Sequence, residues 1–350
     1  MPTCFYQTQD YLKARFDTVG KSLRFQANTV DAWRIWRAEF LAALRELLGV
    51  VRMVPAPLNP RITEEVQCQG YKRQRVEIDT EPGVTMPLYV LIPDGLSAPV
   101  AGLICPHGHG SGGKVCPAGC TEVPGVTARI QEYNYDYGVQ YSCRGYVVFC
   151  PDARGFGERR ESLYESDDNF FNSSCWQLAH MSLPLGLTVA GMWTWDLMRL
   201  LDYMQTRPEV LPDKLGCAGL SGGGLQTLYL SALDERVQCA VISGYFYGVK
   251  DSLLEMSGNC DCNFVPRLWE HADMGDIGAL IAPRPVLIEA GREDPLNGHR
   301  GIVNVLEQYE VMRSAYSLLG VPGNAAIDVF EGGHRWHGTV ALEWVDKWLK

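Results

Sequence analysis

The sequence predicts an α/β fold in which a mainly parallel twisted sheet carries helices on both faces. Short, continuously apolar runs end in turn residues, as expected of strands that are covered on both faces. Amphipathic helical stretches separate several of these runs, and strands that alternate with helices pair in parallel. The expected strands cover residues 100–106, 146–152, 214–221, 237–244, 285–291 and 326–332, and the expected helices cover residues 189–204, 222–233, 301–319 and 338–349.

The residues before position 100 predict a hairpin and an N-terminal helix. Residues 75–80 and 87–93 are short alternating or apolar runs joined by Glu81-Pro82-Gly83, which is typical of two antiparallel strands. Residues 31–48 place apolar side chains at spacings of three and four, the stripe of an amphipathic helix. We therefore expect the first 60 residues to be helical and the hairpin to open the sheet.

The domain organisation follows from this order of elements. We expect a helical extension over residues 1–69, packed on one α/β domain over residues 70–350. Within that domain, residues 107–140 and 245–283 are weakly periodic and rich in glycine, proline, asparagine and aromatic residues. Each segment is too long to serve only as a connection, so we expect these two insertions to shape a pocket.

Composition and charge exclude several classes of protein. The chain has 350 residues, with 31 Lys and Arg against 41 Asp and Glu, and its net charge of −10 repels phosphate backbones and anionic lipid surfaces. We therefore expect neither a nucleic-acid partner nor membrane binding. The N-terminus shows no apolar leader and no window is apolar enough to span a membrane, which predicts a cytoplasmic protein. Oligomerisation is possible, but the sequence does not indicate a state.

The strongest local motif is Gly219-Leu220-Ser221-Gly222-Gly223, which lies directly between an expected strand and an expected helix. A strand that turns sharply into a helix leaves no space for side chains beside the turn, and it lifts the serine hydroxyl clear of the sheet edge. The free N–H of Gly222 at the helix N-terminus can bind a developing oxyanion. Ser221 is therefore the candidate nucleophile, and the alternative is a glycine-rich turn with a spectator serine.

A serine nucleophile requires a histidine base, and the histidine requires a carboxylate that fixes its tautomer. Asp294 and His334 each follow a different expected strand, so the turns that carry them lie at the same edge of the sheet as Ser221. We therefore predict that Asp294 is the acid and His334 the base. The alternatives are Glu293 for the acid, and His337 or His299 for the base.

The loop after the strand at residues 100–106 supplies a second candidate oxyanion donor, the backbone N–H of His109. We expect the imidazoles of His107 and His109 to brace this loop through hydrogen bonds rather than to act as bases. Residues 108–114 also spell a phosphate loop, G-x-x-x-x-G-K. Val115, however, stands where Ser or Thr must hold magnesium, which argues against nucleotide binding.

The cysteines do not predict a metal site, and no cofactor is expected. The chain has 12 cysteines, and several of them lie inside apolar runs, where a reduced thiol behaves as a small hydrophobe. Cys116-x3-Cys120 and Cys260-x-Cys262 are the pairs closest to a zinc pattern. Neither has the usual two-residue spacing, and no histidine lies at ligand distance in the sequence.

Taken with their order, these motifs resemble the α/β-hydrolase superfamily. The resemblance rests on CPHGHG, GLSGG, GREDP and EGGHRWHG. The helical N-terminal lead, PDARGFGER and CDCNFVP are similar to the acetyl xylan esterase and dienelactone hydrolase-like branch. The resemblance covers about residues 70–350 and, loosely, residues 1–69. After Asp294 the chain reads PLNGHRG, without the bulky apolar turn associated with that branch.

The resemblance implies an α/β-hydrolase fold with a triad of Ser221, Asp294 and His334 and an oxyanion hole at Gly222 and His109. The segment Asp152-Ala153-Arg154-Gly155-Phe156-Gly157 is similar to a motif of that branch, and we expect its polar pair to be structural and to buttress the site loops. The expected function is a serine esterase that cleaves a small-molecule carboxylic ester, such as an acetylated carbohydrate, through an acyl-enzyme. The alternatives are a peptidase or lactone hydrolase with the same triad, or a ligand-binding protein that keeps the fold without catalysis.

Overall fold

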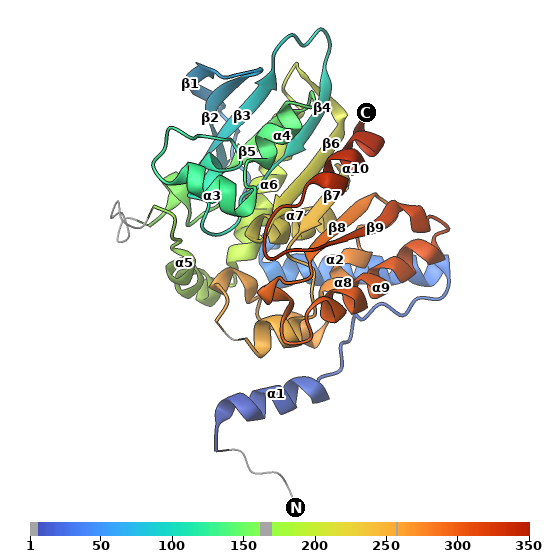
Figure 1. The fold of residues 1–350 in the computed structure, drawn as a ribbon. Helices are drawn as coiled ribbons and strands as arrows, with labels where there is room; N and C mark the ends of the chain where they lie inside the picture. The colour runs from blue at the N-terminus through green and yellow to red at the C-terminus, as the bar shows by residue number, and fades with distance from the viewer. Residues whose placement is uncertain (1–5, 162–169, 257) are drawn as a thin grey trace, which may run out of the picture.

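The computed structural model describes residues 6–161, 170–256 and 258–350 (Figure 1). Within these residues a nine-stranded sheet has the order β1-β2-β3-β5-β4-β6-β7-β8-β9. The pairs β1–β2, β2–β3 and β3–β5 are antiparallel, and all the others are parallel. The predicted α/β fold with a mainly parallel sheet is therefore confirmed. The strands are β1 (Arg61–Gln67), β2 (Tyr71–Glu81), β3 (Val84–Pro93), β4 (Val100–Ile104), β5 (Val147–Pro151), β6 (Val210–Leu220), β7 (Val237–Ser243), β8 (Val286–Gly291) and β9 (Ala325–Phe330).

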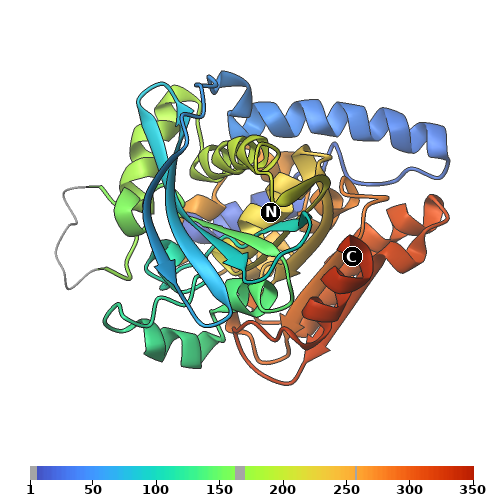
Figure 2. The ribbon, with the colours of Figure 1, turned by 90° about the horizontal axis from the view of Figure 1, so that it is seen from above.

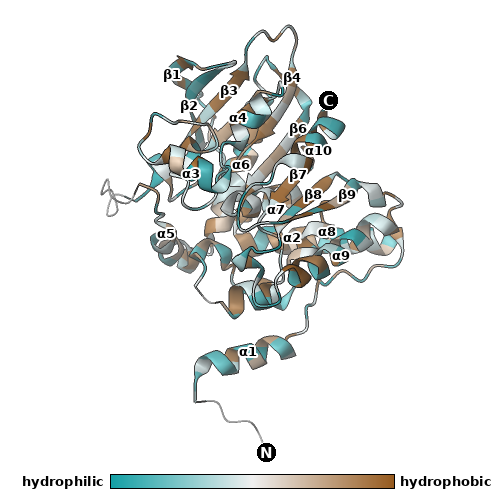
Figure 3. Ribbon diagram, in the orientation of Figure 1, coloured by the Kyte–Doolittle hydropathy of each residue, from teal (hydrophilic) through white to brown (hydrophobic). Residues whose placement is uncertain are grey.

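The parallel strands are continuously apolar because their side chains enter two cores. In β5, Val147 and Phe149 pack into the core on one face of the sheet, whereas Val148 and Cys150 pack into the core on the other face. Figure 2 shows helices on both sides of the sheet, and Figure 3 shows hydrophobic residues gathered on strands such as β3 and β7. The helices are α1 (Thr8–Thr18), α2 (Val30–Leu48), α3 (Val126–Tyr133), α4 (Tyr137–Ser142), α5 (Cys175–Ser182), α6 (Val189–Met204), α7 (Gly222–Leu233), α8 (Met274–Ala279), α9 (Ile302–Leu318) and α10 (Thr339–Leu349).

The N-terminal segment differs from the prediction of a helical extension over residues 1–69. Residues 61–67 form the edge strand β1, whose side chains are mostly exposed. Its sequence, RITEEVQ, lacks the alternation of apolar and polar residues that marks a half-buried strand, and charged residues are common on edge strands. Helix α1 projects away from the sheet and buries no residue (Figure 1). Its Phe16 ring contacts Trp269, with ring centroids 6.0 Å apart.

The two insertions contain short helices that the sequence pattern did not reveal. Helix α3 and part of α4 lie within residues 107–140, and α8 lies within residues 245–283. Each of these helices has only 6 or 8 residues, which is too short for a helical period to show. Across the described part of the chain, no helix is both long enough and apolar enough to cross a membrane.

Candidate active site

Ser221 lies at the sharp turn between β6 and α7. Its backbone has φ 62° and ψ −120°, a left-handed conformation that costs a residue other than glycine about 1–3 kcal/mol and that is typical of functional sites. The backbone N–H of Ser221 donates to the carbonyl of Ser243, at the end of β7, over 2.8 Å. The turn is therefore held in place from the neighbouring strand, and the hydroxyl lies at the carboxyl-terminal edge of the sheet.

The glycines that flank Ser221 are required by close backbone contacts. A Cβ atom on Gly219 would lie 2.5 Å from the carbonyl oxygen of Gly223, and one on Gly223 would lie 2.1 Å from that of Pro106. Both distances are shorter than a Cβ atom tolerates. Positions 219 and 223 must therefore be glycine for the strand, the turn and the loop after β4 to pack this closely. The glycines on both sides of the serine thus have a steric origin.

His334 and Asp294 form a hydrogen-bonded pair at the same edge of the sheet. Nδ1 of His334 lies 2.7 Å from Oδ2 of Asp294, while Oδ1 of Asp294 accepts the backbone N–H of Leu296 over 2.9 Å. Asp294 is 4% exposed. A carboxylate held in this way favours the histidine tautomer that carries its proton on Nδ1 and leaves Nε2 free.

The His334 ring lies over the ends of β6 and β7. A Cβ atom on Gly244 would lie 3.0 Å from Cε1 of His334 and 3.1 Å from the side chain of Leu220, the residue before Ser221. Ser221 and His334 also line the same cavity. The structure therefore brings together the three residues that the sequence assigned to nucleophile, acid and base.

The alternative residues lie elsewhere. The side chain of Glu293 is exposed, and its backbone N–H donates to Gly332. Nδ1 of His337 lies 2.7 Å from Oδ2 of Asp328, and the His337 ring stacks on Phe330 with centroids 4.6 Å apart. His299 is exposed and lies beside Asp251 and Glu255. None of the three alternatives lines the cavity that holds Ser221.

Glu289 is a buried carboxyl group that was not predicted from the sequence. It accepts hydrogen bonds from the Ser243 hydroxyl at 2.7 Å and from the backbone N–H groups of His337 and Gly338 at 2.7 and 2.8 Å. Burial raises the pKa of the Glu289 carboxyl above its ordinary value. Glu289 thereby links β7 to the loop that carries His334. The signal that could have revealed it is a charged residue inside the apolar run VLIEAG.

The loop after β4 lies directly against Ser221. A Cβ atom on Gly108 would lie 2.8 Å from Cβ of Ser221. The carbonyl groups of residues 106–109 each accept a side-chain hydrogen bond, which fixes the orientation of successive peptide units. The donors are Tyr137 to Pro106 at 2.6 Å, Gln226 to His107 at 2.9 Å, Ser111 to Gly108 at 2.8 Å and Tyr135 to His109 at 2.9 Å. This loop and the first N–H of α7, on Gly222, are thus held beside the serine.

The two imidazoles of this loop have different surroundings. His107 is buried, its Nδ1 lies 3.0 Å from the carbonyl oxygen of Gly108, and its Nε2 accepts the backbone N–H of Ala153 over 3.1 Å. Burial lowers the pKa of His107 to about 4, so the ring is neutral at pH 7. His109 instead directs Nε2 toward Cys262, with the nitrogen and sulfur 3.5 Å apart.

Lys114, the lysine of the phosphate-loop pattern, is occupied by an ion pair. Its Nζ donates to Oδ2 of Asp152 over 2.7 Å, its backbone N–H donates to Oδ1 of the same carboxylate over 2.7 Å, and its side chain is 2% exposed. Glu158 binds the same ammonium group. Lys114 therefore anchors the loop after β4 to PDARGFGER and is not available to a phosphate.

Arg154 in PDARGFGER also makes structural contacts. Its guanidinium forms two hydrogen bonds, of 2.9 and 2.8 Å, with the carboxylate of Asp196 in α6, and Arg159 binds the same carboxylate. Burial raises the pKa of Asp196, but the guanidinium groups of Arg159 and Arg154 outweigh it and hold that pKa well below its ordinary value. These pairs support the predicted buttressing role of the motif.

A cavity of about 370 Å³ opens above Ser221. It includes Ser221, His334, Gly222 and His109, and the remaining walls come mainly from the two insertions. Those walls are tyrosines and small polar residues, namely Gly110, Tyr133, Tyr135, Tyr245, Tyr247, Gly258, Asn259, Cys260 and Asn263, together with Leu296. The sequence predicted that the insertions shape a pocket, but most of these wall residues were not identified because the insertions carry no periodic pattern.

A second cavity, of about 390 Å³, lies between α1 and residues 264–270. Its walls are mostly apolar and include Phe16 and Trp269. It contains none of the predicted site residues, so the chemistry belongs to the cavity above Ser221.

This chain is similar to known proteins over nearly its whole length. The sequence profile of the Abhydrolase family matches residues 8–329, a range that includes Ser221 and Asp294 and ends before His334. A protein of Bacillus subtilis (strain 168) named "Putative hydrolase YtaP" is 27% identical over 327 residues, which are 89% of this chain and 100% of that protein.

Solved structures share the fold at low sequence identity. One from Bacteroides fragilis NCTC 9343, described as "a putative acetyl xylan esterase", has a TM-score of 0.76 at 21% identity, covering 93% of this chain and 83% of its own. A glucuronoyl esterase from Solibacter usitatus has a TM-score of 0.68 at 14% identity, and the match covers 94% of this chain and 98% of the esterase. An acetyl xylan esterase from Paenibacillus sp. R4 has a TM-score of 0.59 at 16% identity, and the match covers 99% of this chain and 100% of that esterase.

Proposed function

The chain belongs to the Abhydrolase family, and on that premise we propose that it is a serine hydrolase that cleaves carboxylic esters. Family membership also confirms the resemblance to α/β hydrolases. The observation that carries the proposal is the 2.7 Å contact between Asp294 and His334, because His334 lines the same cavity as Ser221, which lies on its strained turn. The esterase names of structures with the same fold support the ester class.

In the first half of the proposed reaction, the Ser221 hydroxyl attacks the ester carbonyl while Nε2 of His334 takes its proton. The Asp294 carboxylate accepts a hydrogen bond from Nδ1–H of His334 and, without taking that proton, stabilises the imidazolium that forms. Backbone N–H groups of Gly222 and His109 bind the oxyanion. The tetrahedral intermediate then collapses, the C–O bond to the leaving alcohol breaks, and the imidazolium returns its proton to that oxygen. The product is an acyl-enzyme on Ser221.

In the second half, a water molecule takes the position of the leaving alcohol. His334 accepts a proton from this water, whose oxygen attacks the acyl carbon. The same N–H groups bind the second oxyanion. When this intermediate collapses, the bond to Ser221 breaks, the serine oxygen regains its proton from His334, and a carboxylic acid leaves.

The cavity supports a small, polar ester as substrate. The rings of Tyr133 and Tyr245 offer apolar faces. Asn259 lines the cavity with an amide group whose Nδ2 donates to the carbonyl of Ser252 over 2.6 Å, which leaves its oxygen to accept from a substrate. A sugar presents the matching surfaces, because its C–H faces pack on aromatic rings and its hydroxyl groups bind amides. We propose an acetylated carbohydrate or another small acyl ester.

We also propose a cytoplasmic location, which the sequence predicted. No cysteine among the described residues is paired in a disulfide, and a reducing compartment maintains that state.

Turnover of a substrate panel tests this proposal. The panel contains acetylated sugars, small acyl esters, lactones and peptide amides, and the readout is kcat/KM for each. We expect acetylated sugars or small acyl esters to exceed lactones and amides by at least about tenfold, because the polar cavity binds their transition states better. Ser221→Ala controls for contaminating activity. If lactones or amides were hydrolysed faster, they would be the substrate class instead of acyl esters. Folded protein that turns over no member of the panel would contradict the hydrolase assignment.

A further inference from the structure

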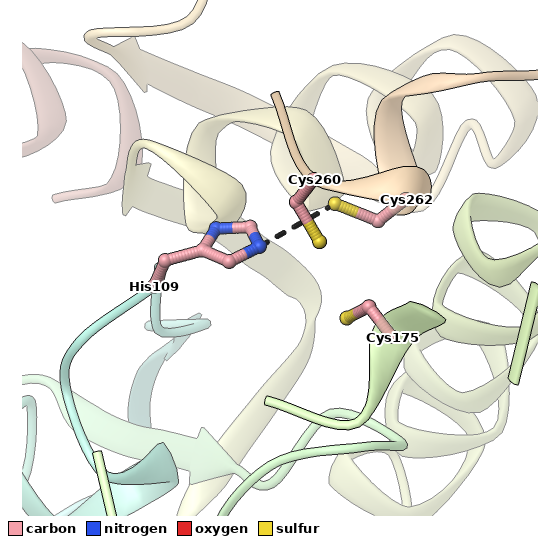
Figure 4. A group of neighbouring side chains, drawn as sticks. All are labelled: His109, Cys175, Cys260 and Cys262. Atoms are coloured by element: carbon pink, nitrogen blue, oxygen red, sulfur yellow. Dashed lines mark hydrogen bonds between the residues drawn. The ribbon is translucent and has the colours of Figure 1, made fainter. Parts of the chain in front are cut away.

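Four side chains with metal-binding atoms converge beside the active-site cavity (Figure 4). His109 comes from the loop after β4, Cys175 begins α5, and Cys260 and Cys262 come from the second insertion. One ring nitrogen and three sulfurs lie within 4.8 Å of one another. We propose that this cluster binds a zinc ion.

The distances suit tetrahedral coordination by three sulfurs and one nitrogen. Zinc binds sulfur at about 2.3 Å and imidazole nitrogen at about 2.0–2.1 Å, so a tetrahedral site separates a nitrogen from a sulfur ligand by about 3.6 Å. Nε2 of His109 already lies 3.5 Å from Sγ of Cys262. The ion therefore requires only small movements of side chains that already face one another.

The cluster differs from a simple packing of buried thiols. Cys175 and Cys262 are buried, and a reduced thiol alone behaves as a small hydrophobe. Here, however, the sulfurs turn toward one another and toward an imidazole nitrogen. All three sulfurs and a ring nitrogen of His109 lie within 4.8 Å of one another, close enough for a single ion to contact the four atoms. Thiolate sulfur and imidazole nitrogen are the ligand atoms that zinc prefers, and the cluster presents both.

Zinc also accounts for all four residues, whereas a disulfide would use only two of the sulfurs. Binding would release the remaining thiol protons and leave three thiolates and a neutral imidazole around the ion. Cys260 lines the active-site cavity, which gives the ion a path to the cluster. With four protein ligands the tetrahedron is complete, so the site would be structural, without an open position for water.

The sequence did not reveal this arrangement, because zinc patterns in sequence pair cysteines that are neighbours in the chain. The structure places Cys120 beside Arg73, with the guanidinium 2.9 Å from the sulfur. Cys120 and Cys116 pack in the core on one face of the sheet, whereas Cys262 packs in the core on the other face. The partners of Cys260 and Cys262 are instead Cys175 and His109, which are remote in sequence.

The cluster joins three segments that border the proposed oxyanion hole. A Cβ atom on Gly222 would lie 3.1 Å from Nδ1 of His109, so the imidazole lies between Gly222 and the sulfurs. Zinc on Nε2 would leave the proton on Nδ1 and fix the ring between them. This consequence for catalysis rests on the proposed function, but the metal site itself does not.

Metal analysis of the intact protein tests the site without using its activity. Protein purified under reducing conditions with zinc supplied should contain about one zinc per chain by elemental mass spectrometry. After the zinc is removed with a chelator, added Co²⁺ should produce the visible absorption bands of tetrahedral cobalt and a sulfur-to-cobalt charge-transfer band. Zinc should raise the melting temperature of the zinc-free protein, because it binds the folded state. Folded, reduced protein that binds neither ion would overturn the proposal.

Matched variants locate the site. Cys260→Ser and Cys175→Ser should each weaken zinc binding by at least about 100-fold and abolish the cobalt charge-transfer band. Cys143→Ser changes an exposed cysteine outside the cluster and should bind zinc as the unaltered protein does. Retained binding in both cluster variants would overturn the assignment. Free thiols should also be counted by titration of denatured, chelator-treated protein, which has 12 cysteines. A count of 10, with the two missing thiols mapped to the cluster, would also overturn the assignment, because a disulfide would then occupy the cluster.

Discussion

Replacing Asp294 by asparagine is expected to lower kcat for ester hydrolysis by about 10⁴-fold while the protein stays folded. Oδ2 of Asp294 lies 2.7 Å from Nδ1 of His334 and fixes the tautomer of that ring. An asparagine that turns its NH2 group toward Nδ1 favours the opposite tautomer, in which Nε2 carries the proton and cannot accept one from Ser221. The asparagine oxygen can still accept the N–H of Leu296, as Oδ1 of Asp294 does, so the turn is preserved. Steady-state kinetics with circular dichroism measures both effects.

Glu293→Gln is the matched control for Asp294→Asn. Glu293 is the adjacent carboxylate, but its side chain is exposed and does not line the cavity. Its loss should cost less than about tenfold in kcat, because it touches neither the base nor the substrate. Nearly normal hydrolysis by folded Asp294→Asn protein would contradict the assignment of Asp294 as the acid. A large loss of kcat in Glu293→Gln would indicate that Glu293 is the acid instead.

Replacing His334 by alanine is expected to lower kcat by at least about 10³-fold, because a serine hydroxyl is a poor nucleophile without a base. No other histidine of the described residues lines the cavity with Ser221 except His109, whose ring faces Cys262. His337 points to Asp328 and stacks on Phe330, so it is held by a separate pair of contacts. Turnover of His334→Ala should be measured alongside its thermal stability, so that a loss of activity can be separated from a loss of fold.

His337→Ala is the control for the base, since the two histidines lie three residues apart in the same loop. Its removal should reduce kcat far less than removal of His334. The main consequence should be lower stability, through the lost contacts with Asp328 and Phe330. If His337→Ala lowered kcat more than His334→Ala does, His337 would be the base and Asp328, its hydrogen-bond partner, would be the acid.

The residues that could be identified from the sequence are those whose role leaves a local pattern. Ser221 is bracketed by glycines because the turn meets the loop after β4 with no room for a Cβ atom. Asp294 and His334 each follow a parallel strand, and such strands read as continuous apolar runs because both of their faces are buried. A strand end is therefore visible in sequence, and so is the functional residue placed directly after it.

The residues that could not be identified depend on contacts between distant segments. The walls of the cavity come largely from the insertions, where short helices and turns leave no period. The cluster around Cys260 depends on a histidine about 150 positions away in the chain, which no local spacing rule can detect. Strand β1 was missed for a different reason: an exposed edge strand has no buried face to impose alternation on its sequence.

Covalent labelling with a fluorophosphonate, followed by peptide mass spectrometry, tests directly whether Ser221 is the nucleophile. Such a probe reacts with a serine only when a base and an oxyanion hole activate it. We predict a single adduct on Ser221 of the unaltered protein, none on Ser221→Ala, and much slower labelling of Asp294→Asn. Labelling at another residue, or no labelling of folded protein that still hydrolyses esters, would show that Ser221 is not the nucleophile.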